Sequence, residues 1–165
     1  MFIRRTLTTQ ILQGAKEIPV IAIVGARQSG KSTLAREIFK DYRYFDMQDA
    51  DLFSFAKNDP KGFLNNYANE VGIIIDEAQY VPELFAQIKV EVDKNPRPGY
   101  FVLTGSQNFL LHDKINESLA GRVYQYTLLP LSIAELKEAN LLPQTPEELV
   151  FKGFYPRIYQ GGHGY

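Results

Sequence analysis

The stretch that decides the fold of this chain is Gly25-Ala26-Arg27-Gln28-Ser29-Gly30-Lys31-Ser32, which matches the pattern G-x-x-x-x-G-K-[ST] at every fixed position. Its glycines let the backbone curl so that several N–H groups point into one concavity, where they can hold phosphate oxygens. Lys31 adds a mobile positive charge for the β- and γ-phosphates, and Ser32 adds a hydroxyl that can ligate Mg²⁺. The stretch therefore predicts a loop that binds the phosphates of a nucleotide.

The residues on either side of this loop favour that interpretation over a chance match in a turn. Residues 19–24 are apolar and end at Gly25, which is typical of a strand buried on both faces of a parallel sheet. Residues 31–39 follow as a helix with Leu34, Ala35 and Ile38 on its inner face. A strand, the loop and a helix in this order are the context that such a motif requires.

The alternation of strands and helices continues along the chain. It predicts βαβ crossovers and a three-layer α/β fold, in which a mostly parallel five-stranded sheet carries helices on both faces. Beyond the first strand, we expect strands at 42–47, 71–75, 100–103 and 122–128. Helices are expected at 3–12, in two pieces within 50–69, at 83–93, at 132–140 with a capping box from Ser132 and Glu135, and at 147–151. Residues 161–165 read as a frayed tail.

Two carboxylates follow the third strand, at Asp76 and Glu77. Ligands of open α/β sheets bind at the carboxyl ends of the strands, so we expect Asp76 to hold the Mg²⁺ shell and Glu77 to act as general base on a water. Small-molecule kinases transfer phosphate to a bound acceptor and need no such base, so the pair favours hydrolysis. No N-K-x-D element that would read guanine follows, which favours ATP over GTP.

Several further side chains are candidates for the reaction, each with a plain structural alternative. Thr104 and Ser106 follow the fourth strand and are candidates to sense the γ-phosphate or orient the water, or are simply turn residues. Arg122 stands at the start of the fifth strand and is a candidate for stabilising transition-state charge, or is a solvated strand-end arginine. Arg27, inside the loop, is expected to face solvent or a neighbouring subunit.

Composition narrows the class of protein. The chain has 165 residues, 45% of them hydrophobic, with a formal net charge of -1 and no cysteine. Disulfides and cysteine-based zinc sites are therefore excluded, and no overall basic charge indicates nucleic acid as a partner. The start MFIRRTLTTQ lacks the apolar run of a secretory signal, and no apolar stretch reaches the roughly 20 residues of a membrane span, so a cytoplasmic location is expected.

Five segments in order resemble a known family. They are Gly25 to Thr33, Ile75-Asp76-Glu77-Ala78-Gln79, Leu103-Thr104-Gly105-Ser106, Ser118-Leu119-Ala120-Gly121-Arg122 and Leu129-Pro130-Leu131-Ser132. Together they are similar to the AAA-type, AAA+-like P-loop ATPases of bacteria and archaea that carry a nuclease-like C-terminal domain of unknown function. The likeness runs from about Ile3 to Pro156.

This resemblance implies more than the residues show alone. It implies a sheet in the order 5-1-4-3-2, ATP and Mg²⁺ as cofactors, and nucleotide binding by the loop through Thr33. It also implies that Arg4 and Arg5 approach the nucleotide base, and that Gly153 to Arg157 leads into the family's C-terminal region. Relatives of the family continue well beyond Tyr165. We therefore expect an ATPase core at 1–129 and a partial helical or linker segment at 130–165, in a chain that is an excised domain or a truncated gene product.

The leading functional hypothesis is a Mg-dependent ATPase domain that acts as a switch or motor for a missing C-terminal domain, with slow hydrolysis in the isolated chain. The alternative is an ATP-binding interaction module that does not hydrolyse. A helicase, suggested by the superficial similarity of Asp76-Glu77-Ala78-Gln79 to D-E-A-x boxes, needs a second lobe for which the chain has no room. Besides ATP and ADP, expected partners are further copies of the chain or another protein.

Overall fold

Three apolar strands form the centre of the structure, a computed structural model that describes residues 2–106 and 109–159, except the side chains of 109–112 and 114. They are β1 (Val20–Gly25), β3 (Ile73–Asp76) and β4 (Phe101–Ser106), and nearly every residue in them is buried. β2 (Arg43–Asp46) and β5 (Val123–Thr127) lie at the two edges. The order is β2-β3-β4-β1-β5 and every pairing is parallel, which confirms the predicted sheet.

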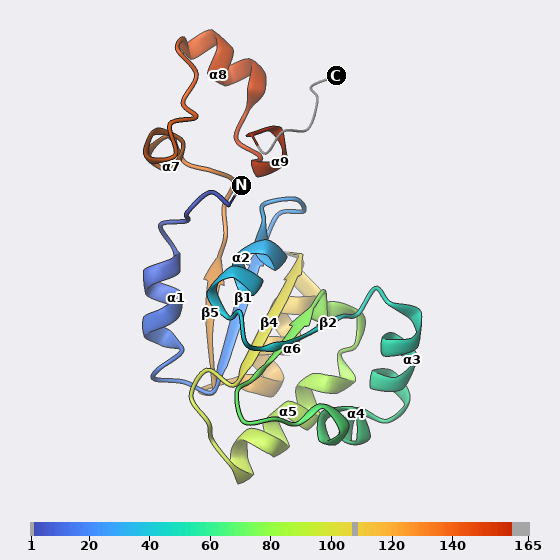
Figure 1. Cartoon of the computed structure of the whole chain (residues 1–165). Helices are drawn as coiled ribbons and strands as arrows, with labels where there is room; N and C mark the ends of the chain where they lie inside the picture. Colours follow the sequence, from blue (N-terminus) through green and yellow to red (C-terminus); the bar gives the residue numbers. More distant parts are fainter. Residues whose placement is uncertain (1, 107–108, 160–165) are drawn as a thin grey trace.

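Helices cover both faces of the sheet, as predicted (Figure 1). α1 (Thr8–Gly14) and α2 (Lys31–Ile38) pack on one face, against the side chains that include Ile21, Ile23 and Ile74. The other face carries α3 (Ala50–Asn58), α4 (Pro60–Tyr67), α5 (Glu83–Lys94) and α6 (Phe109–Leu119). Because side chains alternate along a strand, each central strand contributes to both cores.

Two local predictions differ from the structure. The first helix begins at Thr8 rather than near Ile3, because Ile3 packs into a separate cluster formed with the C-terminal segment. The sequence analysis assigned no element to residues 109–119, where the structure has α6. The side chains of Ile115 and Leu119 from this helix are buried in the core beneath the sheet.

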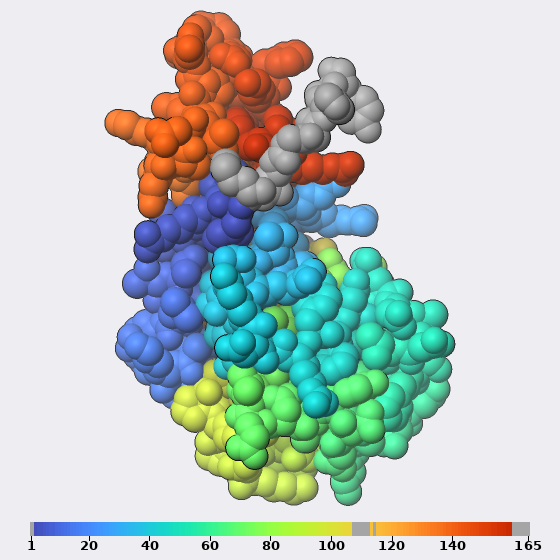
Figure 2. Space-filling view, viewed as in Figure 1, coloured from blue at the N-terminus to red at the C-terminus, as the bar shows by residue number. Residues whose placement is uncertain are grey.

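The C-terminal segment forms its own small hydrophobic cluster. It contains α7 (Ile133–Glu138), α8 (Pro146–Lys152) and α9 (Pro156–Tyr159), and the predicted capping box of Ser132 and Glu135 is present at the start of α7. Leu131 and Leu136 are buried with Ile3 from the N-terminus. Figure 2 shows this segment, in orange and red, as a lobe above the sheet domain. The expected frayed tail at 161–165 lies outside the described residues.

None of the helices in the described ranges combines the length and the apolar character needed to span a bilayer.

Candidate nucleotide site

The parallel register brings the ends of the central strands to one edge of the sheet. Gly25 at the end of β1 pairs with Ser106 at the end of β4, and Ile75, which precedes Asp76, pairs with Leu103. α2 begins at the same edge, directly after the loop. The sequence therefore places the loop and the acidic end of β3 side by side, as expected for a site of this class.

Backbone geometry makes two glycines of the loop necessary. Gly30, which precedes α2, has a φ of 94°, in the left-handed region that favours glycine. At Gly25 a Cβ atom would collide with the carbonyl oxygen of Leu128. Gln28 also has a positive φ of 63°, an uncommon conformation for a residue with a side chain, and such local strain is concentrated at functional sites.

The start of α2 is open to a ligand. No side chain caps it, and the first N–H groups of a helix have no partner within the helix. They face a cleft of about 280 Å³ whose lining includes Gly30, Lys31, Ser32 and Thr33. The hydroxyl of Ser29 is buried beneath the loop and has no hydrogen-bond partner. Unpaired N–H groups at a helix start attract an anion such as phosphate.

Lys31 bridges the loop from inside. The side chain is 4% exposed, and its Nζ donates a hydrogen bond to the carbonyl oxygen of Ala26 at 2.8 Å. Burial lowers the pKa of Lys31, while the nearby charges of Glu77 and Asp76 act in the opposite direction. A phosphate group entering the cleft would give this partly desolvated ammonium group a charged partner in place of a neutral carbonyl oxygen.

Asp76 is the most strongly held polar side chain of the site. It is 4% exposed, and its Oδ1 accepts hydrogen bonds from the Ser32 hydroxyl at 2.9 Å and from the Thr104 hydroxyl. Its Oδ2 accepts a hydrogen bond from the Tyr44 hydroxyl at 2.5 Å. Carboxylate and hydroxyl oxygens are the hard ligands that Mg²⁺ prefers, so Ser32 and Asp76 fit that ion.

Glu77 lies beside this cluster in a conformation that non-glycine residues seldom adopt, with a φ of 52°. Its carboxylate accepts a hydrogen bond from the Gln79 side-chain amide, and its backbone N–H contacts the Thr104 hydroxyl at 3.4 Å. Glu77 lines both the 280 Å³ cleft and another of about 200 Å³ that Ser106 and Arg27 also line. The structure thus brings the predicted base and Ser106 together next to the loop.

Comparison with known proteins agrees with this geometry. A family model described as an AAA domain matches residues 17–137. This chain belongs to the AAA domain family. Uncharacterized proteins of Mycobacterium tuberculosis and Mycobacterium bovis are each 34% identical to this chain over 136 residues, which is 81% of this chain and 30% of theirs. The chain thus spans less than a third of the length of these curated relatives.

A solved structure shares the fold. The Walker-type ATPase PABY2304 of Pyrococcus abyssi superposes with a TM-score of 0.61 at 20% sequence identity, over 94% of this chain and 65% of that one. At this level of identity the likeness concerns the fold alone. It agrees with the parallel sheet and the helix layers of the AAA domain described above.

Arg4 and Arg5, near the N-terminus of the chain, occupy different environments. Arg5 is 5% exposed and donates hydrogen bonds to the carbonyl oxygens of Ser29, Leu129 and Pro130 and to Glu135. Arg5 borders the 280 Å³ cleft, and the hydrogen bonds of its guanidinium connect the phosphate loop to the C-terminal segment. The side chain of Arg4 is 74% exposed, and its nearest acidic partner is Glu138 at 3.9 Å. The structure does not place Arg4 in the lining of this cleft.

The prediction for Arg122 is wrong. Val123 pairs with Val20, the first residue of β1, so Arg122 lies at the amino edge of the sheet, opposite the loop that follows Gly25. Its guanidinium donates hydrogen bonds to both carboxylate oxygens of Asp93, at 2.5 and 3.0 Å. The position before a parallel strand always faces away from the carboxyl edge, which is the physical reason for the error.

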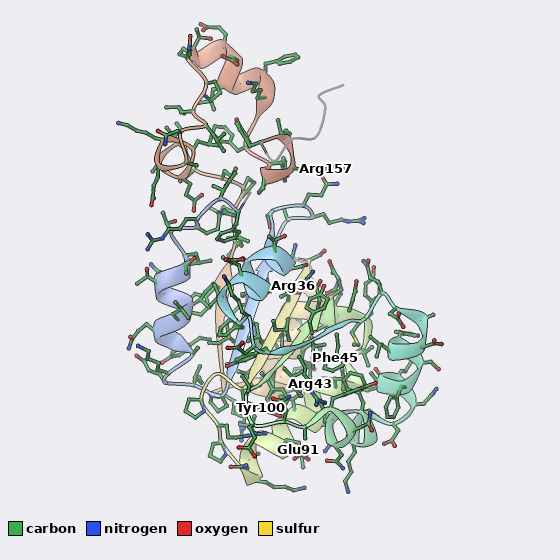
Figure 3. All side chains as sticks on the ribbon, in the orientation of Figure 1. Arg36, Arg43, Phe45, Glu91, Tyr100 and Arg157 are labelled. Carbon is green, nitrogen blue, oxygen red and sulfur yellow. The ribbon has the colours of Figure 1, made fainter. Side chains whose placement is uncertain are left out.

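The sequence did not predict the residues that close the 280 Å³ cleft on the side opposite the phosphate loop. Phe2 and Leu131 contribute apolar surface, and Pro156 and Arg157 come from α9. A Cβ atom on Gly30 would lie 3.6 Å from Pro156, so α9 sits against the loop. Figure 3 shows Arg157 on α9, just above the loop. The Pro-Arg pair after Tyr155 is visible in the sequence, but nothing in the sequence indicates that it lies against the phosphate loop.

Proposed function

We propose that this AAA domain binds ATP together with Mg²⁺ and hydrolyses it. The observation that carries the proposal is the 2.9 Å hydrogen bond between Ser32 and Asp76 at the uncapped start of α2. It joins the two oxygen ligands suited to Mg²⁺ at the point where helix N–H groups and Lys31 can hold phosphates. The phosphates of ATP would bring negative charge to Lys31 and to the helix N–H groups, and the metal would bring positive charge to Asp76.

Each part of the loop has a role in binding. The backbone of Gly25 to Thr33 surrounds the phosphates, and Lys31 exchanges its bond with the Ala26 carbonyl for the β- and γ-phosphate oxygens. Ser32 and Asp76 would hold Mg²⁺, which would supply positive charge to neutralise the phosphates. The apolar side chains of Phe2, Ile3, Leu131 and Pro156 in the lining suit a planar base. We do not assign contact with the nucleotide base to Arg4 or Arg5. Arg5 donates hydrogen bonds to protein groups, and Arg4 lies outside the lining of the cleft.

Hydrolysis needs a base and a cation. Glu77 takes the proton of the attacking water, held in orientation by Gln79, and Ser106 lines the same small cleft where that water would enter. Thr104 contributes by fixing Asp76 rather than by touching phosphate. In place of Arg122, we propose Arg157 as the cation of this chain that meets charge developing on the γ-phosphate, since it lines the cleft and pairs with no acidic side chain among the described residues.

The ATPase is proposed to act as a switch or motor for further polypeptide. The curated relatives extend far beyond the matched region, and α9 lies both in the cleft lining and at the C-terminal side of the domain. The partner of this switch is proposed to be a following domain, another copy of the chain or another protein. The alternative is a module that binds ATP at the same site as the proposed ATPase but does not hydrolyse it.

One experiment separates these possibilities. Equilibrium binding of Mg-ATP and steady phosphate release are measured on the same sample of parent, Glu77→Gln and, as a matched control, Glu70→Gln at an exposed position before β3. Glu77→Gln keeps size and hydrogen bonding but loses basicity, so we expect ATP binding to persist and phosphate release to stop. Asp76→Asn should weaken the Mg²⁺ dependence instead.

The outcomes are distinct. Binding without phosphate release in the parent favours the non-hydrolysing module. Equal release by parent and Glu77→Gln means that the general base lies elsewhere, and absence of Mg-ATP binding in a folded parent refutes the site.

A further inference from the structure

Tyr44 brings an unexpected hydroxyl to the metal-binding aspartate. It stands on the edge strand β2, in register with Ile74 of β3. Because side chains alternate along strands, Tyr44, Asp76 and Thr104 project from the same face of the sheet, the face that α2 covers. Helix α2 and strands β2 and β4 therefore deliver the hydroxyls of Ser32, Tyr44 and Thr104 to one carboxylate on β3.

The three hydrogen bonds are unequally distributed over the two carboxylate oxygens of Asp76. Ser32 and Thr104 share Oδ1, whereas Tyr44 alone holds Oδ2, at 2.5 Å. A carboxylate fixed at both oxygens cannot rotate about its Cβ–Cγ bond, so Oδ1 stays directed at Ser32. Groups that orient a metal ligand in this way typically change metal affinity when they are removed.

We infer that Tyr44 is a positioning residue for the Mg²⁺ site, which it serves by anchoring Oδ2 of Asp76. The inference rests on the proposed function, since it assigns a task within the proposed metal site. Tyr44 touches neither nucleotide nor metal. Its effect passes through the orientation of one ligand oxygen.

The surroundings of Tyr44 set its hydroxyl in place. The ring is half-buried, and the guanidinium of Arg36 on α2 lies 4.9 Å from the ring centroid, in a cation–π contact. Arg36 thus covers the outer side of a ring whose hydroxyl points inward to Asp76. Replacement by phenylalanine keeps the ring and this contact and removes one oxygen atom.

The same strand region offers a matched control. Tyr42 is also half-buried, and its hydroxyl donates a hydrogen bond to the carbonyl oxygen of Gly99 at 3.0 Å, away from the acidic cluster. Tyr42→Phe therefore makes the same chemical change and removes one hydroxyl hydrogen bond, but leaves Asp76 untouched. Any loss of general stability from deleting a tyrosine hydroxyl appears in both variants.

The test is a Mg²⁺ titration of nucleotide binding, with ATP as the probe, on parent, Tyr44→Phe and Tyr42→Phe. ATP affinity is also measured in the presence of a chelator, where no divalent ion is free. We expect Tyr44→Phe to raise the Mg²⁺ concentration at half-saturation by about 10- to 100-fold. ATP affinity in the presence of the chelator should stay within about threefold of the parent, which is about 0.7 kcal/mol of binding free energy. Tyr42→Phe should match the parent in both measurements.

A second variant ties the effect to Asp76. In an Asp76→Asn background, Tyr44→Phe should change the Mg²⁺ half-saturation much less, because the anchored carboxylate is gone. Equal Mg²⁺ titrations for Tyr44→Phe and Tyr42→Phe would overturn the inference while leaving the proposed ATP site intact. A parent that binds ATP with no Mg²⁺ dependence overturns both the metal site and this role, and thermal unfolding curves verify that each variant is folded.

Discussion

Replacing Arg5 with methionine should destabilise the protein far more than replacing its neighbour Arg4. The guanidinium of Arg5 donates to three backbone carbonyl oxygens and lies 3.2 Å from Glu135, and the two side chains of this ion pair are 5% and 4% exposed. Removing one partner of a buried ion pair leaves the other charge uncompensated, at a cost of about 3–5 kcal/mol. That is a large part of the roughly 5–15 kcal/mol by which a domain is stable.

Arg4 is the matched control. It lies 3.9 Å from Glu138, and both side chains are largely exposed. An exposed pair of this kind contributes about 0–1 kcal/mol, so Arg4→Met should change little. Both substitutions replace arginine with an unbranched apolar side chain at adjacent positions, and what differs is the burial of the ion pair and the three carbonyl hydrogen bonds of Arg5.

Urea unfolding followed by far-UV circular dichroism measures the difference. With a slope of about 2 kcal/mol per molar urea, the midpoint of Arg5→Met should fall by about 2 M. The midpoint of Arg4→Met should fall by less than about 0.5 M on the same slope. Equal shifts for the two variants would refute the argument that Arg5 ties the phosphate loop to the C-terminal segment.

The pH dependence provides a second test of this ion pair. Burial acts to raise the pKa of Glu135, but backbone N–H groups of Ser132 and Thr6 and the charge of Arg5 together hold that pKa below its usual value. A depressed carboxyl pKa stabilises the folded state above the unfolded pKa of about 4.5, and this stability is lost as pH falls through the folded value. Glu135→Gln has no such titration, so its deficit relative to the parent should shrink between pH 6 and pH 3. A deficit that stays constant would contradict this account.

Two further predictions concern the nucleotide. Lys31→Ala removes the buried ammonium group of the loop, and since a charged hydrogen bond contributes about 1.5–3 kcal/mol, ATP affinity should fall at least about tenfold without loss of fold. Unchanged affinity in a folded sample would contradict the assignment of the loop. Arg157→Ala should lower phosphate release by about tenfold on the same scale, whereas Arg122→Ala, at the opposite edge of the sheet, should leave release unchanged. The reverse order of effects would restore Arg122 as the cation.

The fold was predictable because its decisive features are local. A few neighbouring residues were enough to predict the conformation of each of these features. They are the loop motif, the apolar runs that form β1 and β3, and the turn glycines. The strand order came from the family resemblance, since nothing in the periodicity of 42–47 or 100–103 says which strand lies beside β1. α6 was not predicted, although Leu111, Ile115 and Leu119 recur in the sequence at the four-residue spacing of one helix face.

The site was predictable only where its residues follow one another closely in sequence. Asp76 and Glu77 end a buried strand, so their edge of the sheet was evident. Tyr44 could be connected to Asp76 only after β2 and β3 were known to be neighbours. The prediction for Arg122 was wrong because this residue precedes β5 and therefore lies at the amino edge of the parallel sheet, away from the phosphate loop.

The C-terminal segment and the phosphate loop are joined by a path that the sequence could not show. Arg5 contacts the Ser29 carbonyl of the loop and, through Glu135, the first turn of α7, while Pro156 of α9 sits against Gly30. A phosphate that reshapes the loop must therefore strain or release contacts that also hold α7 and α9. Because Arg5 and Glu135 are both buried, these contacts cannot be exchanged for water without cost, so we expect the loop and the segment to move together. That coupling is what the proposed switch requires, and it depends on Arg5, whose guanidinium donates its hydrogen bonds to protein groups of both parts.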